Sequence, residues 1–181
     1  MIRLALLFLV VASGCATTKE QYAKLWFRDL ERLYNWVQAD NEARKYKEEE
    51  SQARKYLEDV RAIPDPYAIA SKLRGDGFHW AEERFDFVSY PWVTIARRRG
   101  DCDDFMELWK AIFKWRGKTE RVFVASTGGT AHAMLLFTDT SAPPVLYLLS
   151  NVNVFGRGRP GDEEQLIRLF YRERTAYFVR Y

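Results

Sequence analysis

The sequence predicts an α+β protein in which helices come first and an antiparallel sheet follows. Helical apolar periodicity dominates the first half of the 181-residue chain, whereas short β-rich runs separated by turn signals dominate after Gly117. One strongly patterned helix, beginning at Asp101-Cys102, lies between the two parts. These three observations favour helices packed on a sheet of antiparallel strands.

Length and composition favour one domain with appendages. Hydrophobic residues make up 48% of the chain and aromatic residues 15%, which is enough apolar material for a core. The formal charge is only +3, and basic and acidic residues are interleaved. This balance argues against a nucleic-acid-binding surface.

The N-terminus has the layout of a secretory signal. A positive start at Arg3 is followed by an apolar run from Leu4 to Ala12, which is shorter than the roughly 20 residues of a membrane span. Ala12-Ser13-Gly14-Cys15 resembles a lipobox, where a bacterial lipoprotein is cut and acylated. We therefore expect residues 1–14 to be a signal peptide, with Cys15 carrying lipid. An uncleaved anchor or an ordinary signal peptide are the alternatives.

The residue after that cysteine bears on localisation. By the sorting habit of such lipoproteins, Ala16 in place of aspartate implies the outer membrane, with the protein facing the periplasm.

Residues 15–62 are expected to form a lipidated tether and a charged helical arm. Two apolar stripes at helical spacing lie on either side of a polar break at Asp40-Asn41. They comprise Ala23, Trp26, Leu30, Leu33 and Val37, and then Tyr46, Ala53, Leu57 and Val60. The two helices either pack on the following domain as a hairpin or stand off it as a spacer.

Residues 63–181 are expected to form the domain itself. Asp65 can cap a short helix that runs to about Leu73, and Gly75-Asp76-Gly77 is a turn. Residues 78–93 are aromatic-rich and irregular, and Pro91 argues against a central strand there.

The next helix has Asp101 as N-cap and Gly117 at its C-terminal end. Its buried stripe comprises Phe105, Leu108, Trp109, Ile112 and Phe113. Strands are expected at 121–126, 131–138, 145–152 and 175–181, with a basic glycine loop at 155–161 and a short helix capped by Asp162.

Cys102 is the one thiol left if Cys15 is acylated. At the first turn of a helix a thiolate faces unpaired N–H groups, which lower the pKa of a thiol from about 8.5. The three arginines at 97–99 add positive potential, whereas Asp101, Asp103 and Asp104 oppose it. We therefore expect a further cation near the sulfur, and histidine would supply it.

His132 stands near the start of an expected strand, about 30 residues downstream. A strand laid over the start of the cysteine helix would bring its ring to the sulfur, and the pair would be largely thiolate and imidazolium. His79 lacks such a context and is expected to be structural or on the surface.

Gly-Asp-Cys-Asp-Asp-Phe at 100–105, followed by a helix and a strand that begins with His132, resembles the bacterial transglutaminase-like cysteine proteinases. The resemblance covers about residues 78–152 and extends to Phe85-Asp86-Phe87 and Pro91-Trp92-Val93-Thr94. It implies a papain-like fold, with Cys102 as nucleophile and His132 as general base and acid. The implied chemistry is attack on a peptide or side-chain amide, with the thioester resolved by water or an amine.

That family carries an Asp followed by an Asn on the strand after the histidine. Here Leu149-Ser150-Asn151 occupies this place, so Ser150 stands at the Asp position. A hydroxyl can accept the imidazole N–H bond but cannot stabilise imidazolium by charge. Asn151 would serve instead if a bulge near Ser150 turned it to the histidine.

Two further groups are candidates for the site. The indole N–H of Trp92 would join the Cys102 backbone N–H as an oxyanion donor, although a core aromatic is the alternative. Asp103, Asp104 and Glu107 are the candidate ligands for calcium, although carboxylates at a helix start need no metal. No other cofactor is expected.

Three functions follow. The first is a lipid-anchored cysteine hydrolase or acyltransferase acting on a protein or a peptidoglycan peptide. The second is a catalytically impaired module that binds a peptide or partner in the same cleft, which Ser150 favours. The third is a structural envelope lipoprotein.

Overall fold

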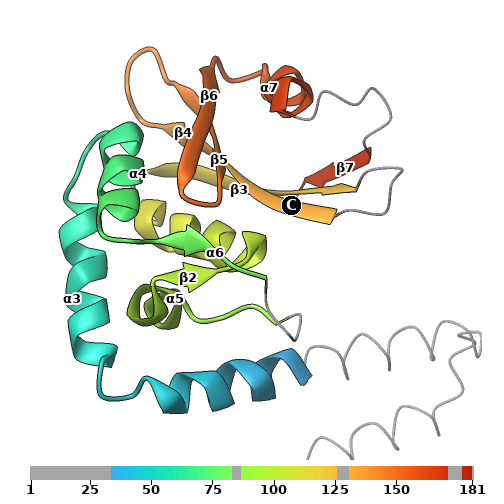
Figure 1. Cartoon of the computed structure of the whole chain (residues 1–181). Helices are drawn as coiled ribbons and strands as arrows, with labels where there is room; N and C mark the ends of the chain where they lie inside the picture. The colour runs from blue at the N-terminus through green and yellow to red at the C-terminus, as the bar shows by residue number, and fades with distance from the viewer. Residues whose placement is uncertain (1–33, 83–86, 126–130, 171–176, 181) are drawn as a thin grey trace, which may run out of the picture. The chain divides into compact units, whose positions relative to one another are not determined.

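The computed structural model describes residues 34–82, 87–125, 131–170 and 177–180 (Figure 1). The expected signal peptide, Cys15 and most of the first apolar stripe lie outside these residues. Two compact units divide the chain, Met1–Val37 and Gln38–Tyr181, and the second contains all the labelled elements. Within the described ranges no helix is both long and apolar enough to cross a membrane.

The first described helix continues through Asp40 and Asn41 to residue 45, so the break predicted at these two residues was wrong. The chain turns at 46–49 instead, and α3 (Glu50–Arg61) follows. Polar residues on the solvent side of a helix do not interrupt it, and Asp40 forms an i,i+4 ion pair with Arg44 at 2.8 Å.

Helix α3 packs into the domain core through Ala53, Leu57 and Val60, all buried. Residues 38–62 were expected to belong to the arm. They lie within the second compact unit, which begins at Gln38 rather than at residue 63. For this part of the arm the structure therefore favours packing on the domain over a spacer.

Helix α4 (Pro66–Gly75) begins as the sequence predicts. The Asp65 side chain accepts hydrogen bonds from the backbone N–H groups of Tyr67 and Ala68, at 3.2 and 3.0 Å. Pro66 takes the first helical position, where its missing N–H costs nothing. Gly77, in the predicted turn, adopts φ 87°.

The described residues between Phe78 and Gly100 include short regular elements that the sequence did not indicate. Strand β1 (His79–Trp80) pairs in parallel with β2 (Arg99–Gly100), and α5 (Pro91–Arg97) lies between them along the chain. Pro91 starts this helix, as expected for a residue that does not belong in a central strand, and residues 81–82 and 87–90 are irregular as predicted.

Helix α6 (Cys102–Phe113) has the predicted N-cap, Asp101, whose side chain accepts from the Asp104 N–H. The helix ends before Gly117, so Gly117 is not its C-terminal glycine as predicted. Gly117 instead opens β3 (Gly117–Ala125), where a Cβ would collide with the carbonyl oxygen of Thr138 on the neighbouring strand.

The sheet has the order β6-β5-β4-β3-β7, and every neighbouring pair is antiparallel. Its other members are β4 (Ala131–Asp139), β5 (Leu146–Ser150), β6 (Asn153–Gly158) and β7 (Tyr177–Arg180). Strand β6 was predicted to be a loop because Gly156 and Gly158 disfavour a strand. The close approach of α7 (Glu163–Phe170) explains these glycines, since a Cβ at Gly156 would lie 3.2 Å from Leu166.

Helices lie on both sides of the sheet (Figure 1), and each face carries its own apolar layer. Ala133, Leu135 and Phe137 of β4 face helices α3 to α6, and the intervening Met134 and Leu136 pack with Leu166 and Ile167 of α7. The α+β class is thus confirmed, with helices on both faces of an antiparallel sheet.

Candidate functional site

Cys102 is the first residue of α6 and is partly buried. The backbone N–H of Ala133 on β4 and the N–H of Cys102 itself both face its sulfur and favour the thiolate. The thiol therefore lies where the helix N-terminus meets the beginning of strand β4.

Burial nevertheless raises the pKa of the Cys102 thiol, and the Asp101 and Asp103 carboxylates add to this rise. The two backbone N–H groups lower the pKa by less than burial and the carboxylates raise it. The resting residue is thus a neutral thiol at neutral pH, which differs from the thiolate that the sequence predicted.

Two of the three arginines that were expected to add positive potential, Arg97 and Arg98, make other contacts. Arg97 donates to the Ser89 hydroxyl at 3.1 Å and lies 4.0 Å from the Asp104 carboxylate. Arg98 donates to the carbonyl oxygen of Asp76 at 3.0 Å. Both guanidinium groups are therefore engaged away from the sulfur.

His132 lies on β4, two positions before Met134, and its Nε2 is 2.6 Å from the Ser150 hydroxyl oxygen on β5. Its ring stacks on that of Phe170 from α7, with centroids 5.7 Å apart and planes 11° apart. Burial lowers the pKa of His132, so the imidazole is neutral at neutral pH.

Cys102 and His132 line the same pocket, whose volume is about 370 Å³. The other residues that line it are Trp80, Glu82, Asp101, Ala131 and Asn151. The structure thus brings the predicted cysteine and histidine to one cavity, although they come from a helix and a strand.

Ser150, rather than Asn151, reaches the imidazole. Strand β5 keeps regular pairing with β4 through Leu149, and the register shift near Leu148 and Leu149 inserts the extra residue in β6. The Ser150 side chain stays on the His132 face and is buried. The bulge that would have turned Asn151 to the histidine is therefore not in β5.

Asn151 instead makes the turn between β5 and β6. Its backbone adopts φ 47°, a left-handed conformation that asparagine tolerates well. Its carbonyl oxygen accepts the indole N–H of Trp109 at 2.6 Å, and its side-chain Oδ1 is buried without a hydrogen-bond partner in the described part of the chain.

The structure does not bring Trp92 to the pocket. This residue is buried in the α5 layer of the core, with the guanidinium of Arg54 5.9 Å from its ring centroid. Trp92 is therefore a core aromatic, the alternative role considered from the sequence. It is not among the residues lining the cavity. His79 is exposed, with Nδ1 3.0 Å from the carbonyl oxygen of Gly77, in line with a surface role.

Much of the Gly-Asp-Cys-Asp-Asp segment has a structural purpose. Asp104 is completely buried, and its Oδ1 accepts the Ser89 N–H at 2.6 Å. A Cβ at Gly100 would lie 2.6 Å from Asp104 Oδ2, so only glycine leaves room for this carboxylate. Asp104 therefore joins the segment before α5 to the start of the cysteine helix.

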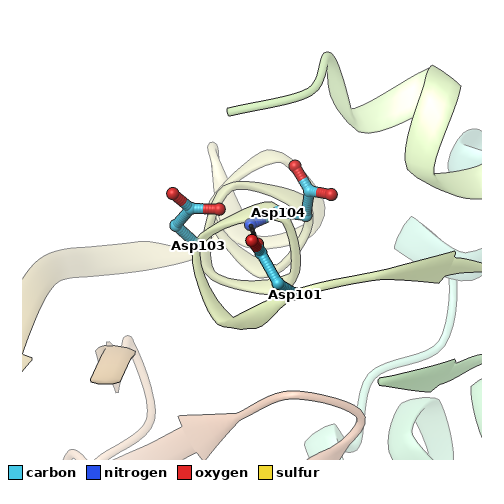
Figure 2. Close-up of side chains that lie close together, drawn as sticks. All are labelled: Asp101, Asp103 and Asp104. Atoms are coloured by element: carbon cyan, nitrogen blue, oxygen red, sulfur yellow. Dashed lines mark hydrogen bonds between the residues drawn. The ribbon is translucent and has the colours of Figure 1, made fainter. Parts of the chain in front are cut away.

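Figure 2 shows the three aspartates around the first turn of α6. Oxygen atoms of Asp101, Asp103 and Asp104 lie within 4.8 Å of one another. Glu107, the third ligand of the calcium prediction, instead pairs with Arg121 of β3 at 2.5 Å. Calcium binding stays a prediction of the sequence.

Sequence reasoning missed Trp80 and Glu82 as pocket residues. Trp80 pairs with Gly100 across the β1–β2 ladder, which places it beside the cysteine segment. A two-residue parallel ladder leaves no periodic signal, so no local pattern could have found it.

No model of a known protein family matches the chain, and neither a curated protein nor a solved structure is significantly similar to it.

Proposed function

We propose that this chain is an envelope lipoprotein whose domain is a Cys-His hydrolase or acyltransferase with a papain-like, transglutaminase-like arrangement. Cys102 is the nucleophile and His132 the general base and acid. The observation that supports this most is that both side chains line one pocket, with His132 held by Ser150 through Nε2. The substrate is an amide in a protein or a peptidoglycan peptide.

The hydrogen bond at Nε2 determines which nitrogen is available. When Nε2–H donates to the Ser150 hydroxyl, Nδ1 is unprotonated and can accept a proton. Because thiol and imidazole are both neutral at rest, the nucleophile forms by proton transfer during attack.

In the proposed reaction, the Cys102 sulfur attacks the amide carbonyl carbon while its proton passes to His132. The C–N bond then breaks, and the imidazolium returns the proton to the departing amine. Water attacks the resulting thioester, gives a proton to His132 and releases a carboxylic acid together with the free thiol. An amine in place of water gives a new amide.

Localisation rests on the sequence alone. We propose acylation at Cys15 and attachment to the outer membrane, facing the periplasm. Growth with an alkynyl fatty acid should label the full chain, and Cys15→Ser should abolish the label.

The test of the chemistry is acylation of Cys102 by 4-nitrophenyl acetate, read by peptide mass spectrometry of the full chain. His132→Ala should slow acylation about 100-fold or more, because it removes a general base. His79→Ala is the matched control, since it removes the exposed histidine, and it should leave the rate unchanged. Equal rates for His132→Ala and the wild type would refute the hydrolase proposal.

A binding module is the second candidate. The neutral hydroxyl of Ser150 and the raised pKa of the Cys102 thiol both work against an ion pair, and this favours it. In that case Cys102→Ala retains a bound peptide or partner in a pull-down, and acylation of Cys102 does not depend on His132.

A further inference from the structure

The pocket beside Cys102 is lined in part by acidic and amide residues. These are Glu82, Asp101 and Asn151. No lysine or arginine is among the described residues that line it. The His132 imidazole carries no compensating charge at neutral pH, because burial lowers its pKa. The described part of the lining is therefore electronegative.

Trp80 adds an aromatic surface to this electronegative pocket. Its side chain is 52% exposed although it lies in a well-ordered ladder, where the Ala81 N–H also donates to the Gly100 carbonyl oxygen at 2.9 Å. Cation–π pairs in the described part of the chain involve Phe113, Tyr56, Trp92 and Trp115, but not Trp80. An indole that is exposed next to carboxylates is a good receptor for an ammonium or guanidinium group.

Asn151 provides a separate indication of a ligand. Its Oδ1 is buried and accepts no hydrogen bond from the described residues, whereas buried acceptors are almost always satisfied. A ligand whose N–H donors reach this oxygen would satisfy it.

We infer that the pocket binds a positively charged side chain of the substrate, the ammonium of a lysine-type residue or the guanidinium of arginine, next to the amide that Cys102 attacks. Glu82 and Asp101 supply the opposite charge, Trp80 the aromatic face and Asn151 an acceptor. The inference deepens the proposed function and rests on it in one respect, because it takes the bound side chain to be part of a substrate. Binding of the cation itself requires no catalysis.

A bound cation also changes the nucleophile. The Asp101 carboxylate raises the pKa of the Cys102 thiol, so a positive charge beside Asp101 offsets that effect. The substrate thereby promotes formation of the thiolate that attacks it, and an empty site stays in its unreactive thiol form.

The first experiment measures charge selectivity at the thiol. Full-length protein is treated with methanethiosulfonates that carry either a trimethylammonium or a sulfonate group, and modification of the Cys102 peptide is followed by mass spectrometry. The thiolate fraction cancels in the ratio of the cationic to the anionic rate, and division by the same ratio for glutathione corrects for the intrinsic reactivities of the two reagents. We expect this normalised ratio to be about tenfold in favour of the cation.

Glu82→Gln should reduce that preference several-fold. Glu58→Gln removes the same charge from an exposed position on α3, outside the pocket, and should leave the preference unchanged. A wild-type ratio equal to that of glutathione, or a preference that survives Glu82→Gln, would overturn the inference.

The second experiment measures occupancy. N-acetyl-lysine amide should protect Cys102 saturably from a neutral methanethiosulfonate, and the uncharged norleucine analogue should not. Trp80→Leu should weaken protection. Equal protection by both compounds, or none by the lysine derivative, counts against a cation site.

The two proposals can fail separately. If acylation of Cys102 does not depend on His132 while the lysine derivative still protects the thiol, the hydrolase proposal fails and the cation site stands. If acylation depends on His132 but the thiol shows no charge preference, the cation site fails and the hydrolase proposal stands.

Discussion

Nε2 of His132 lies 2.6 Å from the hydroxyl oxygen of Ser150, and the two residues come from neighbouring strands, β4 and β5. The hydroxyl orients the ring and selects its tautomer, as a carboxylate would. It contributes no negative charge, however, and burial lowers the pKa of His132. The Ser150 hydroxyl thus orients the imidazole but does not stabilise it as imidazolium.

Ser150→Asp should supply the missing charge. A carboxylate in hydrogen-bond range favours imidazolium, so we expect the pKa of His132 to rise by about one unit or more. NMR titration of the ring measures this, and iodoacetamide alkylation of Cys102 at pH 7 should accelerate with it. Ser150→Ala, which removes the hydroxyl without adding charge, should not raise the pKa of His132. An unchanged titration in Ser150→Asp would contradict the proposed pairing.

Removing the carboxylates beside the thiol should also activate it. Asp101 and Asp103 both raise the pKa of Cys102, so Asp101→Asn and Asp103→Asn should each lower it. At a pH below the pKa the thiolate fraction then increases, and alkylation should quicken by about threefold to tenfold. Asparagine preserves a side-chain oxygen for the N-cap at 101.

The measurement for these two variants is the rate of iodoacetamide alkylation between pH 6 and 10. In the wild type the rate should rise through a pKa above that of an ordinary thiol. Glu58→Gln serves as a remote charge control. Wild-type alkylation that persists below pH 7 would mean that the thiolate is paired with imidazolium after all.

Phe170 of α7 keeps the imidazole buried by stacking against it. Phe170→Leu should admit water to the ring and relieve the burial that lowers the pKa of His132, so this pKa should rise toward its ordinary value. NMR titration of His132 gives the result. Leu169→Ala, at an exposed position on the same helix, is the control and should leave the titration unchanged. A fall in the pKa would show that Phe170 does not cause the burial.

Features that depend on neighbouring residues in the chain were predictable from the sequence. Asp65 and Asp101 cap the helices they precede, because N-capping needs only a short polar side chain and the next turn. The contact between His132 and Ser150 was one of two possibilities that the family resemblance left open, the other being Asn151.

Features that depend on distant pairing were missed. Trp80 enters the pocket through a ladder with Gly100, twenty residues away, and β6 forms because β5 offers it an edge. The expectation that Arg97 and Arg98 add positive potential at the Cys102 sulfur failed for a similar reason. Arg97 and Arg98 adjoin the cysteine segment in sequence, but Ser89 and Asp76 hold them elsewhere.

A substitution at Asp104 measures how much this residue of the cysteine segment contributes to the stability of the fold. Its carboxylate is fully buried, accepts the Ser89 N–H and lies 4.0 Å from Arg97, whose side chain is only 6% exposed. Asp104→Asn keeps the size but removes one of the two described carboxylates that lie 4.0 Å from the Arg97 guanidinium, the other being Glu42. We expect the free energy of unfolding to fall by about 2–5 kcal/mol. Urea unfolding measures the change, and the exposed Asp59→Asn should alter stability by no more than about 0.5 kcal/mol. Equal stability of the two variants would mean that Asp104 does not hold the start of the cysteine helix to the segment before α5.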